Sequence, residues 1–194
     1  MPSARCVPVS TRAASPPTRG STYPCRSSGS AIRATCLTSS SGPRGSSHGV
    51  DPAFTATAEA LGSLLAHRGI GLVYGGGKVG LMGVVADAVL NGGGTVTGVI
   101  PRHLWEKEVG HDGLTELLIV DSMHERKLAM ADRSDAFVAL PGGVGTFEEV
   151  FEAITWTQLG IHDKPVAFVD AAGFYEPLLT FLDRTVEAGF LAPG

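Results

Sequence analysis

The sequence predicts a protein of the α/β class with a mainly parallel sheet. From residue 71 onward, short apolar runs alternate with segments that have the apolar spacing of helices, a pattern typical of βαβ units. Two glycine-rich turns each join an apolar run to a helical segment. The 194 residues, of which 43% are hydrophobic, suit one globular domain of about 150 residues or slightly more.

The first helix is predicted to begin after Asp51, an N-cap residue that is followed by proline at the first helical position. Its apolar residues fall on one helical face, formed by Phe54, Ala58, Leu61 and Leu65. Gly69 ends this helix, and residues 71–74 form a short buried strand.

The middle of the chain continues the alternation. A helix over 81–90 precedes strands at 95–100 and 117–120, with a polar loop over 102–113 between the two strands. Ser122 is predicted to cap the next helix, with Glu125 completing a capping box.

The last third of the chain follows the same pattern. A buried strand over 136–140 leads through a glycine-rich turn into a helix that includes 150–156. A further strand at 165–169 and a helix at 177–188 complete the set of predicted elements.

The glycine-rich turn from Pro141 to Glu149 is the stretch around which the chain is organised. Free backbone N–H groups and the positive end of a helix meet at such a turn, which suits a phosphate. Thr146 adds a hydroxyl group. An alternative is purely structural, because Thr146 and Glu149 have the spacing of a capping box. The density of glycine favours ligand binding.

A second glycine-rich turn, from Gly75 to Gly80, follows the strand at 71–74. It is not a P-loop, because no Lys-Ser/Thr pair closes it. Gly75, Gly77 and Gly80 fit G-x-G-x-x-G, but no acidic residue follows the next strand to bind a dinucleotide ribose. In an open α/β sheet both turns lie at the carboxyl edge, where ligands bind.

Residues 1–44 differ from the rest of the chain, because they contain six arginines and no Asp, Glu or Lys. We interpret them as a disordered or mis-specified leader, with an organelle transit peptide as the alternative, and place the domain at 45–194. No strand is recognisable before the loop at Gly45, and Ser39–Arg44 is polar. Loss of a central strand would expose neighbouring edges, so we expect low solubility or reduced stability.

The composition limits which partners and which cellular location we expect. The net charge of −4 gives no basic surface for nucleic acid, and no apolar run approaches the roughly 20 residues that span a bilayer. The three cysteines lie before residue 45 without zinc-ligand spacing, and the six histidines have no metal spacing. We therefore expect a cytoplasmic protein with no metal.

Three segments together resemble the LOG ("Lonely Guy") family, cytokinin riboside 5′-monophosphate phosphoribohydrolases long labelled lysine decarboxylases. They are Met123–Lys127, Ser134–Phe137 and Pro141–Glu149, and the resemblance continues from Thr155 to Pro165. It covers roughly 45–194, and the paired M-x-x-R-K and P-G-G-x-G-T-x-x-E motifs are highly specific. A final segment usual in the family is absent.

The resemblance implies a Rossmann-like three-layer sandwich, a homodimer and a site near the dimer interface. It implies hydrolysis of the N-glycosidic bond of an adenosine 5′-monophosphate, with or without an N6 substituent, to free base and ribose 5-phosphate. It implies no metal and no organic cofactor.

The family's functional residues carry over by position. Arg126 and Glu149 match the catalytic pair, and Gly75, Gly76 and Gly77 match the phosphate-side glycine turn. The positions that match substrate-binding residues are Glu108, Arg126, Lys127, Gly143, Val144, Gly145, Thr146, Phe147, Glu148, Glu149 and Thr155. A carboxylate at Glu149 would stabilise the oxocarbenium character that develops on the sugar and would position a water.

Other functions remain open at the level of sequence. A nucleotide-binding or carrier protein on the same fold, without turnover, is the main alternative, because fold alone does not decide function. A literal lysine decarboxylase would need pyridoxal phosphate on a Schiff-base lysine, and no lysine here lies in such a context. A non-functional product of a damaged gene is a further alternative.

Overall fold

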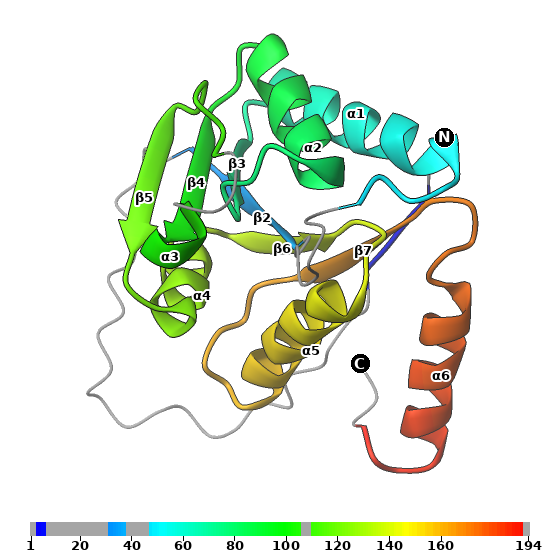
Figure 1. Cartoon of the computed structure of the whole chain (residues 1–194). Helices are drawn as coiled ribbons and strands as arrows, with labels where there is room; N and C mark the ends of the chain where they lie inside the picture. Colours follow the sequence, from blue (N-terminus) through cyan, green and yellow to red (C-terminus); the bar gives the residue numbers. More distant parts are fainter. Residues whose placement is uncertain (1–2, 7–30, 38–46, 106–109, 192–194) are drawn as a thin grey trace.

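The computed structural model describes residues 3–6, 31–37, 47–105 and 110–191 (Figure 1). Its strands are β1 Ser3–Cys6, β2 Arg33–Leu37, β3 Gly71–Tyr74, β4 Val96–Pro101, β5 Glu116–Val120, β6 Ala136–Ala139 and β7 Val166–Asp170. Its helices are α1 Pro52–His67, α2 Gly80–Asn91, α3 Arg102–Trp105, α4 Met123–Asp132, α5 Val144–Gln158 and α6 Glu176–Glu187.

The strands form one seven-stranded sheet in the order β1-β7-β6-β2-β3-β4-β5. The six strands from β2 to β7 are parallel to their neighbours, and β1 adds an antiparallel edge to β7. From β2 the chain builds outward through β3, β4 and β5, and then returns to the other side of β2 with β6. The strand order therefore reverses between β2 and β6, the kind of position at which open α/β sheets bind ligands.

The prediction that no strand precedes Gly45 is wrong. Residues 33–37 form β2, which lies in the centre of the sheet and pairs with both β3 and β6. Its short Arg-Ala-Thr-Cys-Leu sequence stands in an arginine- and serine-rich stretch, where five residues give too little periodicity to recognise. The expectation of low solubility or reduced stability depended on a missing central strand. Since β2 fills that position, this expectation has no support. Ser39–Arg44 and the rest of the predicted leader outside 3–6 and 31–37 lie outside the described residues.

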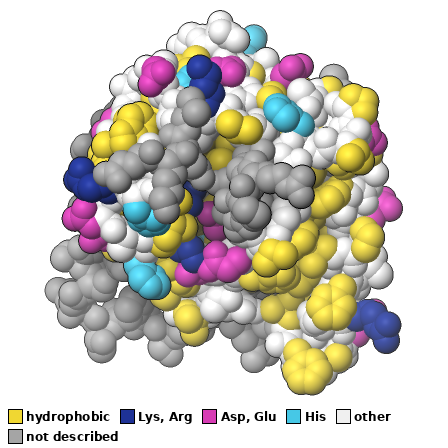
Figure 2. Space-filling view, in the orientation of Figure 1, with side chains coloured by type: hydrophobic (Ala, Val, Ile, Leu, Met, Phe, Trp, Pro, Cys, Tyr) yellow, Lys and Arg dark blue, Asp and Glu magenta, His cyan; other side chains and the backbone are white. Residues whose placement is uncertain are grey.

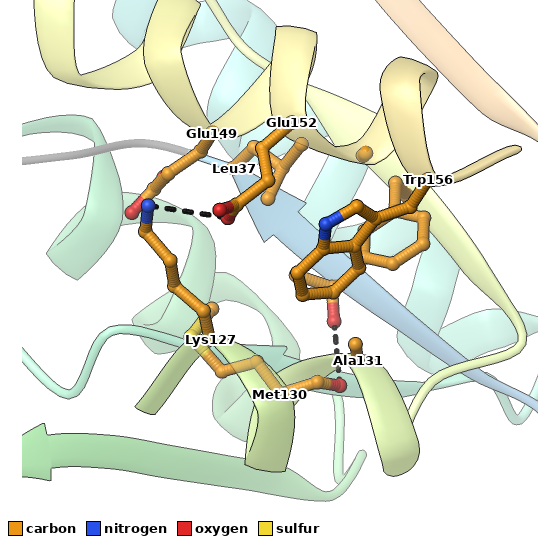
Figure 3. A pocket seen from close by; sticks show the side chains of 10 residues that line it. Leu37, Lys127, Met130, Ala131, Glu149, Glu152 and Trp156 are labelled. Carbon is orange, nitrogen blue, oxygen red and sulfur yellow. Dashed lines mark hydrogen bonds and ion pairs between the residues drawn. The ribbon is translucent and has the colours of Figure 1, made fainter. Parts of the chain in front are cut away.

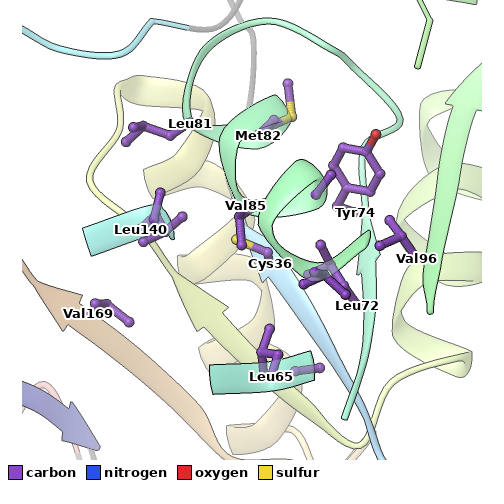
Figure 4. Packing of buried hydrophobic residues seen from close by; sticks show 14 residues of the cluster. Cys36, Leu65, Leu72, Tyr74, Leu81, Met82, Val85, Val96, Leu140 and Val169 are labelled. Atoms are coloured by element: carbon purple, nitrogen blue, oxygen red, sulfur yellow. The ribbon is translucent and has the colours of Figure 1, made fainter. Parts of the chain in front are cut away.

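Helices cover both faces of the sheet, which gives the expected three layers (Figure 1). On one face α1 and α2 pack on the sheet through the cluster drawn in Figure 4, to which Cys36, Leu72 and Val85 belong. On the other face α5 and α6 bury a second cluster that contains Leu37, Phe137 and Ile154. Because successive side chains of a strand point to opposite faces, the neighbours Cys36 and Leu37 bind the two layers together.

The predicted start of α1 is confirmed in detail. The Asp51 side chain accepts a hydrogen bond from the backbone N–H of Ala53 at 2.8 Å, and proline occupies the first turn. At α4, Ser122 Oγ accepts from the Glu125 N–H at 3.1 Å, whereas the Glu125 carboxylate accepts from the Asp121 N–H at 3.0 Å. The return bond of the capping box thus reaches one residue further than expected.

One local prediction needs correction, and the capping-box alternative at Thr146 and Glu149 is wrong. The loop expected over 102–113 contains the short helix α3, and its residues 106–109 lie outside the described part. Helix α5 begins at Val144, after Gly143 as N-cap without a side-chain cap bond. Thr146 and Glu149 therefore lie within the helix rather than forming a capping box, and both are buried. Among the described residues, no helix is long and apolar enough to cross a membrane.

The central position of β2 predicts the effect of truncating its side chains. Leu37 is 4% exposed, whereas Ile32, just before the strand, is 61% exposed. Leu37→Ala should lower the free energy of unfolding by about 2–4 kcal/mol because it leaves a cavity between β2 and α5. Ile32→Ala should change it by less than about 0.5 kcal/mol. Urea denaturation of both variants measures this difference, and equal effects would contradict the placement of β2.

Candidate active site

The two glycine turns lie at one edge of the sheet. The turn of Gly75–Gly77 directly follows β3, and Pro141–Gly143 directly follows β6. Strand β2 lies between β3 and β6 and runs parallel to both. The carboxyl end of β2 is therefore flanked by both turns, at the point where the strand order reverses.

Arg126 is a buried charge at this edge. It projects from α4, is 4% exposed, and its Nε donates to the carbonyl oxygen of Val99 in β4 at 3.2 Å. Its Nη1 lies 3.8 Å from Oε1 of Glu149. A Cβ added at Gly75 would collide with Nη2 of Arg126, so a side chain at this position would displace the guanidinium group from where it lies.

Glu149 faces Arg126 from α5 and is 7% exposed. Its Oε2 is buried and has no hydrogen-bond partner among the described residues. Burial raises the pKa of Glu149 from its ordinary value of 4.5 to about 7, although the positive charge of Arg126 opposes this rise. A carboxyl group that ionises near pH 7 can give up or accept a proton at neutral pH.

Lys127 forms the outer part of the same charge cluster. Its Nζ donates to Glu148 Oε1. The same Nζ lies 3.1 Å from Glu152 Oε2, the contact drawn in Figure 3. Burial lowers the pKa of Lys127, but the hydrogen bonds to Glu148 and Glu152 outweigh that effect and raise it. Lys127 therefore stays protonated and holds two carboxylates of α5 next to Glu149.

An apolar pocket opens beside these charges, between α4 and α5 (Figure 3). It encloses about 330 Å³, counting the part that is open to solvent. Its lining residues are Thr35, Leu37, Lys127, Met130, Ala131, Phe137, Glu149, Glu152, Ala153 and Trp156. In Figure 2 acidic and basic side chains gather near the middle of the visible face, with hydrophobic side chains beside them. The site thus combines a charged mouth with an apolar wall.

The structure brings together only part of the predicted site. Thr146 is fully buried in the first turns of α5, against Gly142, where an added Cβ would collide with its Oγ1. Gly143 and Val144 are exposed at the start of the helix, and Phe147 packs on the core cluster below α5. Gly76 and Gly77 are buried in their turn, and Gly145 is half-buried.

Thr155, a predicted substrate-binding residue, lies apart from this pocket. The Thr155 hydroxyl donates to the Phe151 carbonyl oxygen of its own helix at 2.7 Å on the exposed side, and Thr155 does not line the pocket. Glu108 lies outside the described residues.

Sequence reasoning missed several residues that line the pocket. Glu152, Ala153 and Trp156 follow Glu149 at three, four and seven positions, the spacing of one helical face, so this periodicity could have identified them. Thr35 and Leu37 could not be identified from the sequence, because β2 was not recognised as a strand.

The fold and the site together define a Rossmann-like α/β protein with a buried arginine–carboxylate pair at the sheet's carboxyl edge. The family model described as "Possible lysine decarboxylase" matches residues 82–194. One relative, from rice (Oryza sativa subsp. japonica), is named "Probable cytokinin riboside 5′-monophosphate phosphoribohydrolase LOGL2" and is 54% identical over 149 residues. Another, from Arabidopsis thaliana, is named "Cytokinin riboside 5′-monophosphate phosphoribohydrolase LOG1" and is 52% identical over 149 residues. The chain belongs to this LOG family.

Coverage of these relatives is partial. Each match spans 77% of this chain, but only 61% of the rice protein and 70% of the Arabidopsis protein. Among solved structures, the molybdenum cofactor carrier protein of Chlamydomonas reinhardtii is similar, with a TM-score of 0.58, 22% identity, and coverage of 80% of this chain and 86% of the other. At that identity the likeness concerns the fold alone.

The raised pKa of Glu149 predicts a pH-dependent stability. Between about pH 4.5 and 7 the folded carboxyl group keeps a proton that the unfolded one loses, so the free energy of unfolding falls as the pH rises through this range. We expect a fall of roughly 1–3 kcal/mol from this group between pH 5 and 8. Glu149→Gln should remove that fall, as measured by urea denaturation at both pH values.

Glu187→Gln is the matched control, because Glu187 is exposed at the end of α6. This control should retain the pH dependence of the unchanged protein. An equal fall in stability with pH in the Glu149→Gln variant would show that Glu149 ionises as an ordinary carboxyl group.

Proposed function

We propose that the protein hydrolyses the N-glycosidic bond of adenosine 5′-monophosphates, including N6-modified ones, to free base and ribose 5-phosphate. The observation that carries this proposal is the buried Glu149 carboxyl group, with Oε2 unpartnered among the described residues and Oε1 3.8 Å from Arg126. The names of the relatives that are 52–54% identical support the same reaction.

The reaction needs a group that stabilises positive charge on the sugar. As the bond between the base nitrogen and C1′ breaks, its electron pair leaves with the base and the ribose gains oxocarbenium character. An ionised Glu149 stabilises that charge and accepts a proton from the water that attacks C1′. The departing base gains a proton, so one water is consumed for each base and ribose 5-phosphate formed.

The neighbouring residues would bind the rest of the nucleotide. The start of α5 presents the N–H groups of the Gly143–Gly145 segment, which suit a 5′-phosphate. Arg126 supplies a fixed positive charge between Glu149 and the Gly75 turn. The apolar wall with Met130 and Trp156 suits an apolar substituent on the base. No metal or organic cofactor enters this proposal.

We further infer a homodimer and a cytoplasmic location. Several large apolar side chains of α5 and the loop after it are exposed, including Phe151, Leu159 and Ile161, and an exposed apolar surface of this kind fits a second copy of the chain. The cytoplasmic location rests on the sequence, because no cysteine follows residue 36.

A carrier protein that binds a nucleotide without turnover is the second candidate. The molybdenum cofactor carrier protein of Chlamydomonas reinhardtii has a similar fold, and fold alone does not decide between a carrier and an enzyme. A carrier would need neither an unpartnered buried carboxyl oxygen nor a pKa near 7 at Glu149. These two features favour the enzyme.

Product analysis tests the proposal. The purified chain is incubated with AMP and with N6-isopentenyladenosine 5′-monophosphate, and base and ribose 5-phosphate are separated by chromatography. Glu149→Gln should lower the rate of base release at least about a hundredfold because it removes the ionisable oxygen. The kcat/KM of the unchanged chain should rise with pH through about pH 7, as Glu149 ionises.

Glu187→Gln should release base at the rate of the unchanged chain. Tight binding of AMP by the unchanged chain, with no base released from either nucleotide, would contradict the enzyme and leave the carrier.

A further inference from the structure

His111 is a buried histidine that the proposed reaction does not use. It lies between α3 and β5 in the chain and is 6% exposed. Its Nε2 lies 2.8 Å from Oδ1 of Asp87 in α2, and its Nδ1 accepts a hydrogen bond from the Gly113 N–H at 3.2 Å. Because Nδ1 accepts, Nε2 carries the proton and donates to Asp87. The ring is therefore held at both nitrogens.

The backbone of Gly110 and His111 is bonded to the turn of Gly75–Gly77. The His111 N–H donates to the carbonyl oxygen of Gly76 at 3.3 Å, and Gly110 forms an antiparallel bridge with Gly77. Asp87 belongs to the helix that this same turn opens. The turn is thus linked to His111 in two ways. One link is the direct backbone bonding, and the other runs through α2 to Asp87 and its hydrogen bond with the His111 ring.

The turn of Gly75–Gly77 packs against the Arg126 side chain. An added Cβ at Gly75 would collide with Nη2 of Arg126, and Gly76 has a positive φ of 79° that favours glycine. A shift of this turn would therefore change the space that the guanidinium group occupies. Among the described residues, Arg126 is the one that forms an ion pair with Glu149, with Nη1 3.8 Å from Oε1.

We propose that His111 and Asp87 are a positioning pair, which fixes the Gly75–Gly77 turn and through it holds the Arg126 guanidinium group beside Glu149. Neither side chain touches the substrate in this arrangement. Their effect passes through three steps: the ring-to-carboxylate bond, the backbone bonds to Gly76 and Gly77, and the packing of Gly75 on Arg126. The functional consequence rests on the proposed role of Arg126 and Glu149 in the reaction.

The ionisation of Glu149 gives a readout that a merely structural role would not move. The positive charge of Arg126 lowers the pKa of Glu149, so a loosened guanidinium group should let that pKa rise. The other charges that face Glu149, from Lys127, Glu148 and Glu152, stay the same in the variants below. A loss of folded protein alone would reduce the signal but leave the midpoint unchanged.

The test measures the Glu149 titration by carbon NMR on full-length protein with labelled glutamate carboxyl groups. The Glu149 resonance is identified as the one that Glu149→Gln removes. His111→Ala should raise the midpoint of this resonance measurably, and kcat/KM for AMP should fall about tenfold, the size expected when a hydrogen bond to a charged group is lost. Asp87→Ala should do the same, and the double variant should show no larger effect.

Two further variants control the result. His111→Gln keeps a donor for Asp87, so its Glu149 midpoint and its kcat/KM should lie close to those of the unchanged chain. If His111→Ala does not fold, Asp87→Ala tests the same role, because Asp87 is exposed. His67→Ala, an exposed histidine at the end of α1, should change neither quantity.

A folded His111→Ala or Asp87→Ala variant with unchanged titration and unchanged kcat/KM would overturn the positioning role. Additive effects of His111→Ala and Asp87→Ala would overturn the pairing. Since the NMR titration needs no substrate, a chain that shifts as expected but releases no base would contradict the proposed reaction and keep the positioning role.

Discussion

The parallel pairing of β2 with both β3 and β6 fixes the place of every other functional feature. The order β6-β2-β3 brings together two strands that are 65 residues or so apart in the chain, and with them their glycine turns. It also creates the reversal of strand order at which ligands bind in such sheets. Without β2 the two turns would have no common edge, and the pocket would lose Thr35 and Leu37 from its wall.

The buried charges of the site at this edge lower the stability of the folded protein. Burying both Arg126 and Glu149 removes two charges from water, and at 3.8 Å their attraction offsets only part of that cost. The pKa of Glu149 near 7 expresses the remainder. The fold therefore gives up some stability at neutral pH and gains a carboxyl group that can exchange protons there. Around it, Lys127, the Gly75 turn and the His111–Asp87 pair hold the neighbouring charges in fixed positions.

The sequence was sufficient to predict the mainly parallel sheet and the elements with clear periodicity or capping. Examples are α1, which Asp51 caps, and α4, which Ser122 caps. It failed at β2, whose five residues alternate between two buried faces in an arginine- and serine-rich stretch. Arg126 and Glu149 could be identified only through their motifs, because a lone arginine on a helix is usually solvated. Their burial, and the coupling of His111 to the Gly75 turn, depend on tertiary contacts that no spacing reveals.

The most direct test of the central claim is a crystal structure of the Glu149→Gln variant with AMP bound. C1′ and the glycosidic nitrogen should lie beside the residue 149 side chain, with the nucleotide at the carboxyl edge between the turns after β3 and β6. A nucleotide bound elsewhere, or one whose glycosidic bond lies away from residue 149 and Arg126, would contradict it.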